Sequence, residues 1–310
     1  MVTLLLLLSL GDTIRLPAAV EDLGFLRFDQ KGHLYYAAYS APHLFKLDAD
    51  GKLLANYSRR GPGPGELMTI RDMAVLAGKV YLLDNKQRKL VILDDQLKYL
   101  DQKLMPGFSL LHDLAVSKQH IYLYSYDRDT QKVVHAYDRD MNRAFSFGLP
   151  LQEDAIPANE RMIANHKFGA GYMVITRNRL YVLHYFRYDI QGFDLAGHPI
   201  GRWPLPGIEA KDMYHAPKKQ FEAMATILMA DEEGRLYCTL RNRIPNPVKP
   251  TADTLYRLNP KDGVWNRIPL PGRHFFITPL HKRIPWLKED KHSDAILLRW
   301  MDSPFDKTWP

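Results

Sequence analysis

Arginine, histidine and acidic residues recur in this 310-residue sequence where apolar runs end, and they are its candidates for chemistry. Arginine can offer a carboxylate or phosphate two parallel hydrogen bonds, so a cationic, His-rich cup around a central channel would suit an anion. The alternative is that each run simply ends in solvated polar residues. The candidate ligand-binding residues are Arg71, Asp72, Asn85, His112, Asp113, His166, His184, Arg187, His215, Arg241 and Arg273.

Four histidines also raise the alternative of a metal-dependent enzyme. Histidine nitrogens are common ligands of divalent metals, and single ligands could come from separate repeats. The candidates are His112, His166, His184 and His215. The sequence contains no H-E-x-x-H motif, no G-x-S-x-G elbow and no phosphate loop, so it identifies no catalytic residue. A divalent metal ion is the cofactor to test in this alternative.

Two markers recur in phase along the chain and indicate which elements carry these residues. An aliphatic residue followed by Tyr comes after a tight turn, at Leu34-Tyr35, Val80-Tyr81, Ile121-Tyr122, Leu180-Tyr181 and Leu236-Tyr237. An apolar residue followed by Asp or Asn ends a later strand, at Leu47-Asp48, Leu93-Asp94, Tyr137-Asp138, Phe193-Asp194, Leu258-Asn259 and Met301-Asp302. Repeats of this kind are typical of radial all-β architectures. The sequence predicts an all-β chain, a six-bladed β-propeller of four-stranded antiparallel blades.

The two ends of the chain predict how such a ring would close. Thr13–Pro17 has the pattern of an outer strand but no strands of its own before it, whereas the unit ending at Asp302 has little chain left for an outer strand. We therefore expect the N-terminal strand to complete the last blade, because closure removes free sheet edges. The segment His274–Glu289 lacks the aliphatic-Tyr marker of the other units.

The segment Arg60–Leu67, with the sequence R-G-P-G-P-G-E-L, predicts a connection between two sheets. Its glycines can adopt positive φ and its prolines lack backbone donors, so no strand ladder can continue through it. Glu66 is either a ligand group or, as we favour, a side chain that binds local backbone amides.

This connector, together with Ile70–Asp72, Gly78–Asn85 and Lys89–Asp94, resembles the NHL-type repeats of bacterial six-bladed propellers. Those repeats carry a similar G-x-G-P-G-E-F connector, and Leu67 stands here where Phe is usual. The resemblance covers about residues 25 to 105 and implies the fold. Its relatives include lyases, lactonases, sensor domains and binding modules, so the fold does not select a function.

The longest connections all fall on one predicted face of the ring. They are Leu151–Lys167, Ile208–Met224 and Arg241–Asp253, and Lys218–Met224 has helical character. The opposite face has only tight turns. Loops on a rigid scaffold commonly carry function. We therefore expect the site on this insert-bearing face, near the axis, with short helical inserts around it.

Composition and the N-terminus limit the partners and the compartment. The formal net charge of +7 is dispersed and no nucleic-acid module is present, so nucleic acid is not an expected partner. Val2–Leu10 is apolar and too short to span a bilayer, which predicts a signal-peptide remnant at residues 1–11, or alternatively a buried strand of a cytoplasmic protein. Residues 12–310 would form one domain. The lone Cys238 is expected in the core.

Together these patterns predict a periplasmic or extracellular, monomeric binding module without a transmembrane segment. Its partner would be a small anionic ligand, a glycan or a protein. The alternative is a metal-dependent lyase or lactonase with its site in the central channel, and a scaffold without a small-molecule site is a third.

Overall fold

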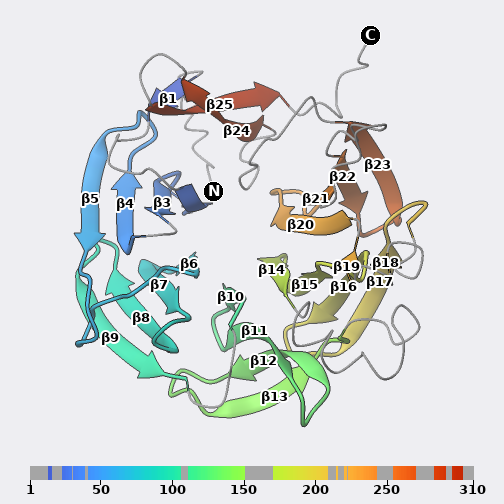
Figure 1. Cartoon of the computed structure of the whole chain (residues 1–310), viewed down its shortest axis with the longest axis horizontal. Helices are drawn as coiled ribbons and strands as arrows, with labels where there is room; N and C mark the ends of the chain where they lie inside the picture. Colours follow the sequence, from blue (N-terminus) through green and yellow to red (C-terminus); the bar gives the residue numbers. More distant parts are fainter. Residues whose placement is uncertain are drawn as a thin grey trace, which may run out of the picture.

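Every regular element of the described structure is a β-strand, and the strands form sheets arranged around a common centre (Figure 1). The computed structural model describes residues 13–15, 23–29, 31–38, 41–105, 111–150, 170–208, 214–215, 220–221, 223–242, 254–269, 283–290 and 295–302. Five sheets have four antiparallel strands each, in chain order from the centre outward. The predicted all-β propeller with four-stranded antiparallel blades is confirmed.

The five blades follow one another along the chain. Blade 1 contains β2 (Leu23–Phe28), β3 (Leu34–Ala38), β4 (His43–Leu47) and β5 (Leu53–Ser58). Blade 2 contains β6 (Asp72–Leu76), β7 (Lys79–Asp84), β8 (Lys89–Asp94) and β9 (Tyr99–Leu104). Blade 3 contains β10 (Asp113–Val116), β11 (Ile121–Asp127), β12 (Lys132–Tyr137) and β13 (Arg143–Phe147). Blade 4 contains β14 (Gly171–Thr176), β15 (Arg179–His184), β16 (Asp189–Asp194) and β17 (Pro199–Pro204). Blade 5 contains β20 (Ala223–Ala230), β21 (Leu236–Asn242), β22 (Thr254–Asn259) and β23 (Val264–Pro269).

The remaining large sheet lies between blades 5 and 1 and joins the two ends of the chain (Figure 1). It has three strands, in the order β1 (Thr13–Arg15), β25 (Ala295–Asp302) and β24 (Arg283–Asp290). Thr13 pairs with Arg299 and Arg15 with Leu297, so the predicted pairing of the N-terminal strand with the last unit is confirmed. The prediction of six four-stranded blades is wrong. The described residues form five, and the described part of the last unit, which lacks the aliphatic-Tyr marker, contributes two strands to its sheet.

The expected helical inserts are also wrong for the part of the chain that the structure describes. Gln220–Phe221 is strand β19, which pairs with β18 (Tyr214–His215) in a two-stranded ribbon. Ala223 and Met224 already belong to β20, where they pair with Asn242 and Arg241. Pairing with neighbouring strands therefore overrides the local helical propensity of this segment.

The recurring acidic marker acts as a turn cap. In the hairpins after Asp48, Asp94, Asp138 and Asp194, each carboxylate accepts the backbone N–H groups two and four residues further on, at 2.8–3.0 Å. A short acidic side chain suits this position because it can bond its own turn. The marker therefore indicates a repeated turn, and these four carboxylates stabilise that turn.

The other marker fills the core between blades. Its side chains are buried, and Val80 lies in one cluster with Leu44 of blade 1 and Leu67 of the connector. Cys238 is likewise fully buried, as predicted. Each blade is thus packed against the next through apolar strand faces, which fixes the positions of the inner strands around the centre.

The Gly/Pro connector is held together by its own residues. Glu66 Oε2 accepts the Gly63 N–H at 2.9 Å, and Lys89 Nζ donates to Gly63 O at 3.0 Å. Gly65 has a φ of 70°, in the left-handed region that favours glycine. The interpretation of Glu66 as a local backbone partner is confirmed.

Candidate functional site

Two inner-strand carboxylates connect neighbouring blades near the centre. Asp72, at the start of β6, accepts hydrogen bonds from Arg27 Nη2 of blade 1 and from the Leu114 N–H of blade 3, both at 2.8 Å. Asp113, at the start of β10, accepts the Met173 N–H of blade 4 at 2.5 Å. Both carboxylates are almost fully buried. These two predicted ligand residues therefore connect the inner strands of four blades through hydrogen bonds.

The same two acids also contact each other. Burial raises the pKa of Asp113 well above its ordinary value, and the charge of Asp72 and a hydrogen bond to its carboxylate raise this pKa further. The Arg27 guanidinium and the Met173 amide oppose the shift but do not cancel it. A hydrogen bond between two carboxyl groups requires a proton, and the raised pKa of Asp113 places that proton on Asp113, which donates it to the Asp72 carboxylate.

Three aromatic side chains meet where blade 3 packs against blade 4. The Tyr124 ring lies between the rings of His112 and His184, with centroid distances of 6.4 and 6.5 Å. Its hydroxyl lies against Gly171, where a β-carbon would come within 2.8 Å of the Tyr124 oxygen. Glycine at this position is therefore required for the close approach of the two blades. The structure brings the predicted residues His112 and His184 together around a tyrosine.

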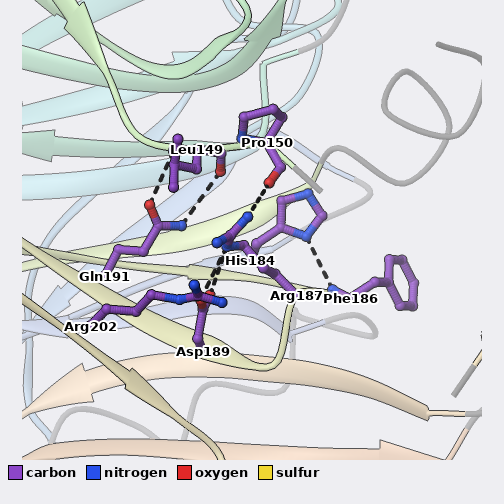
Figure 2. Close-up of polar contacts among 8 residues, drawn as sticks. All are labelled: Leu149, Pro150, His184, Phe186, Arg187, Asp189, Gln191 and Arg202. Atoms are coloured by element: carbon purple, nitrogen blue, oxygen red, sulfur yellow. Dashed lines mark hydrogen bonds and ion pairs between the residues drawn. The ribbon is translucent and has the colours of Figure 1, made fainter. Parts of the chain in front are cut away.

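His184 and Tyr124 each have a buried polar atom that lacks a hydrogen-bond partner in the described part of the chain. The Phe186 N–H donates to His184 Nδ1 at 3.1 Å, which assigns the ring proton to Nε2 (Figure 2). Burial, with the charges of Arg187 and His112, lowers the pKa of His184 to about 3, so the ring is neutral. Burial raises the pKa of the Tyr124 hydroxyl well above its ordinary value. His184 Nε2 and Tyr124 Oη are both buried and have no acceptor among the described residues.

An ion cluster lies beside His184 in blade 4, with Arg187 and Asp189 buried and the Arg202 side chain about half exposed (Figure 2). Arg187 Nε donates to Asp189 Oδ1 at 3.0 Å, and Arg202 Nε contacts the other oxygen of the same carboxylate. Arg187 Nη1 also donates to Pro150 O at 2.8 Å, and Gln191 bonds both backbone groups of Leu149. Two guanidinium groups thus share one carboxylate, which leaves a net positive charge at this position.

A second aromatic pair lies near the two acids. The rings of Tyr172 and Tyr185 are 5.1 Å apart and their hydroxyls are hydrogen bonded to each other. Burial raises the pKa of both hydroxyls, and the nearby Arg71 guanidinium partly offsets this effect. The Arg71 guanidinium therefore lies near the two tyrosines of this region.

The remaining predicted residues have other positions. Asn85 accepts the Thr69 hydroxyl at 3.0 Å beside Asp84, which caps the connector after blade 1, so Asn85 lies in a turn apart from the aromatic group. His215 and Arg241 are backbone positions of β18 and β21. His166 and Arg273 lie outside the described residues.

Sequence reasoning missed Arg27, Tyr124, Tyr172 and Tyr185. For Tyr124 a signal existed, because it lies two residues after the marker tyrosine Tyr122 and therefore on the same face of its strand. No comparable pattern singles out the other three. Arg27 in particular reaches Asp72 from a different blade, a relationship that spacing along the chain does not carry.

Metal sites and membrane-spanning helices each have a structural signature. No three His, Cys, Asp or Glu side chains among the described residues lie close enough together to hold a metal ion. None of the described residues belongs to a helix long and apolar enough to cross a membrane.

Comparisons with known proteins agree with the propeller fold. No protein-family model and no curated protein matches this chain. A candidate exported protein from Bacteroides fragilis is similar in structure, with a TM-score of 0.68, 11% identity and 94% of each chain covered. Virginiamycin B lyase from Staphylococcus aureus matches with a TM-score of 0.56 and 11% identity over 93% of this chain and 98% of the other.

The β-propeller domain of Myceliophteria thermophila Cps50 (Swd1) matches with a TM-score of 0.52 and 10% identity over 93% of this chain and 99% of the other. At such low identities these likenesses show the fold alone. Membership of the NHL-type repeats stays a prediction, since no family model matches.

Proposed function

We propose that this chain is an exported binding module that holds a small anionic ligand between blades 3 and 4, with Tyr124 and His184 as buried hydrogen-bond donors. The observation that carries the proposal is the pair of polar atoms, Tyr124 Oη and His184 Nε2, that have no acceptor among the described residues. A buried donor without an acceptor costs about 1–3 kcal/mol. A ligand oxygen that accepts from both groups would recover that free energy.

The charges around the pair favour an anion. Arg187 and Arg202 share the single carboxylate of Asp189, so one positive charge is left over. Arg187 influences both donors, since its charge opposes the rise in the pKa of Tyr124 and adds to the fall in the pKa of His184. Asp113 adds little negative charge because it is a neutral acid. A carboxylate or phosphate oxygen fits two neutral donors beside a guanidinium.

The burial of the two donors sets a kinetic requirement. Tyr124 and His184 are both fully buried, so binding must include a local shift of side chains. Association that requires a conformational change is slower than the usual range, and we expect a rate constant below about 10⁵ M⁻¹s⁻¹. A faster association would place the ligand elsewhere on the surface.

The test is a panel of carboxylates, sugar acids and organic phosphates titrated into wild-type protein, Tyr124→Phe and Tyr36→Phe. Tyr36 is the matched control, because its hydroxyl is also buried without a partner but lies in blade 1. We expect one anion to bind wild type and Tyr36→Phe equally and Tyr124→Phe at least about 10-fold more weakly, the value of a charge-assisted hydrogen bond. Equal binding by all three proteins would contradict the proposal.

A metal-dependent lyase or lactonase is the second candidate, and the observation in its favour is that His112 and His184 share one environment around Tyr124. The virginiamycin B lyase from S. aureus shows that this fold carries a lyase in another protein. Elemental analysis of wild type and of the variants His112→Ala and His184→Ala distinguishes the two functions. A stoichiometric metal that is lost on substitution supports the enzyme, and its absence in all three proteins supports the binding module.

Export rests on the apolar run Val2–Leu10 and on the candidate exported protein with the same fold. Residues 1–15 fused to a reporter, behind a restored basic start, should direct it out of the cytoplasm. A reporter that stays in the cytoplasm would favour a buried strand.

A further inference from the structure

We infer that a groove between blades 2 and 3, on the face of the ring that carries the first-to-second strand turns, binds a small organic anion with an apolar body. The groove has a volume of about 440 Å³ and is lined by the first-to-second strand turns of both blades and by the outer strand β9. This volume lies within the range of small-molecule sites. The inference is independent of the proposed site, which uses the other neighbour of blade 3.

The rim of the groove is cationic. Four basic side chains line it, against two acidic ones, and one of these acids, Asp101, is paired with Lys103 at 3.1 Å. Lys79 and Lys118 are exposed and come from equivalent turns of the two blades. Three lysines and an arginine thus surround an opening that holds only one unpaired carboxylate, that of Asp140, among its described residues.

Arg139 is held in a fixed position at this rim. Its Nη1 donates to the Tyr81 hydroxyl at 3.1 Å, and its Nη2 donates to Ser117 O at 2.5 Å and to Lys118 O at 3.1 Å. The guanidinium also lies over the Tyr81 ring, 5.6 Å from its centroid. A cation ordered in this way need not lose side-chain freedom when an anion binds beside it.

The repeat itself shows that this cation is not needed to pack two blades together. Arg139 follows the turn acid Asp138, and the corresponding residues in the other blades are Ala49, Asp95, Leu195 and Pro260. At the next interface the marker tyrosine Tyr122 donates directly to Leu195 O at 2.7 Å. Among the five blades, blade 3 alone has a basic residue at the position after the turn acid. That residue lines the same groove as the two exposed lysines.

The floor of the groove is apolar. Leu76, Ile92 and Leu100 contribute to it, and Leu100 remains 47% exposed on β9. An inorganic anion would leave this surface in water, whereas an apolar ring or chain attached to the anionic group would cover it. The chemistry of rim and floor together therefore specifies an amphiphilic organic anion.

The probe for this site is 2-naphthoate, measured by titration calorimetry on the full chain. Its neutral analogue 2-naphthylmethanol lacks the charge, and inorganic phosphate lacks the apolar body. We expect naphthoate to bind at least about 10-fold more tightly than either. If the alcohol binds as tightly as naphthoate, the groove recognises only the apolar body. If phosphate binds as tightly, the groove recognises only the charge. Either result, or no binding of naphthoate, overturns the inference.

Variants locate the binding in the groove. Lys79→Gln with Lys118→Gln alters only exposed side chains, so the protein should fold, and it should bind naphthoate about 10-fold more weakly, as should Arg139→Gln. The matched control is Lys31→Gln with Lys261→Gln, which removes the same charge from exposed turns of blades 1 and 5. Wild-type affinity in the groove variants, or the same loss in the control, refutes the inference. Tyr124→Phe should bind naphthoate normally, and a loss there would move the anion to the other site.

Discussion

Asp113 donates a hydrogen bond to Asp72 across the boundary between blades 2 and 3, and Asp72 also accepts the backbone N–H of Leu114, the residue after Asp113. The two acids have different roles, although both begin an inner strand. Asp72 carries the charge and is neutralised by Arg27, whereas Asp113 is kept neutral by burial and by Asp72. They were both predicted as ligand residues, yet the bonds they make are internal.

This difference predicts opposite responses to amide substitution. Asn at position 113 can still accept the Met173 N–H and donate to Asp72. The free energy of unfolding of Asp113→Asn should therefore lie within about 1 kcal/mol of the wild-type value. Asp72→Asn leaves Arg27 without its counter-charge and should cost about 2 kcal/mol, the value of a charged hydrogen bond whose Arg27 partner is partly exposed. Urea unfolding at pH 7 measures both free energies. Equal losses in the two variants would contradict the shared-proton arrangement.

The raised pKa of Asp113 also predicts a pH dependence. The folded state keeps a proton that the unfolded state releases above pH 3.8, so stability falls as the pH rises from that value toward the raised pKa of the folded state. Asp113→Asn has no proton to lose and should flatten this part of the profile. Unfolding free energies between pH 4 and pH 8, for wild type and variant, give the comparison. Parallel profiles would show that Asp113 is ionised in the folded protein.

Two buried histidines predict loss of stability in acid. Burial lowers the pKa of His135 to about 4 and that of His184 to about 3, against an ordinary 6.5. The unfolded state takes up these protons first, so stability falls as the pH drops below 6.5, by about 2 kcal/mol for each histidine at pH 5. His135→Gln should reduce this pH dependence, because glutamine does not titrate there. An unchanged slope between pH 7 and pH 5 in that variant would contradict the assignment.

The connector predicts a strong effect of a single methyl group. A β-carbon at Gly65 would lie 2.7 Å from the Tyr99 ring, and the φ of 70° is unfavourable for alanine. Gly78 is the matched control, since its φ is 73° but nothing lies within 4 Å of the added carbon. Gly78→Ala should cost about 1 kcal/mol from the backbone alone, and Gly65→Ala at least about 2 kcal/mol more. Thermal unfolding of the pair measures the difference, and similar melting temperatures would refute it.

Closure of the ring predicts that the N-terminal strand stabilises the whole domain. Deletion of residues 12–18 removes β1 and exposes the edge of β25. We expect the melting temperature to fall by more than about 3 °C, which corresponds to about 2 kcal/mol for a domain of this size. A melting temperature equal to that of wild type would mean that the pairing contributes nothing to stability.

The repeat could be predicted because its signals are local. Asp94 caps its own turn, and the marker tyrosine Tyr122 is buried on its own strand. Each such feature produces a recognisable pattern within a few residues of sequence. The strand count of the last sheet could not be predicted, because it depends on pairing between β1 and β25 across the chain. The helical propensity of Lys218–Met224 led to a wrong prediction, because pairing of β19 and β20 with neighbouring strands determines the secondary structure there.

The candidate site was predicted less completely, for a related reason. His112, His184 and Arg187 were identified by their place at strand ends, and the structure brings them together. Their common neighbour Tyr124 was not, because its unpaired hydroxyl results from the packing of two blades at Gly171. Residue types can indicate which groups are available, but only the packing shows which of them lack a partner.

The pairing of β1 with β25 also determines when folding can finish. Blades 1 to 5 each contain strands that are neighbours in sequence, so each can form as soon as its own residues are available. The sheet that closes the ring instead joins Thr13 to Arg299, one of the most distant contacts the chain can make, and such contacts form slowly. During synthesis the ring must remain open until nearly the whole chain has emerged.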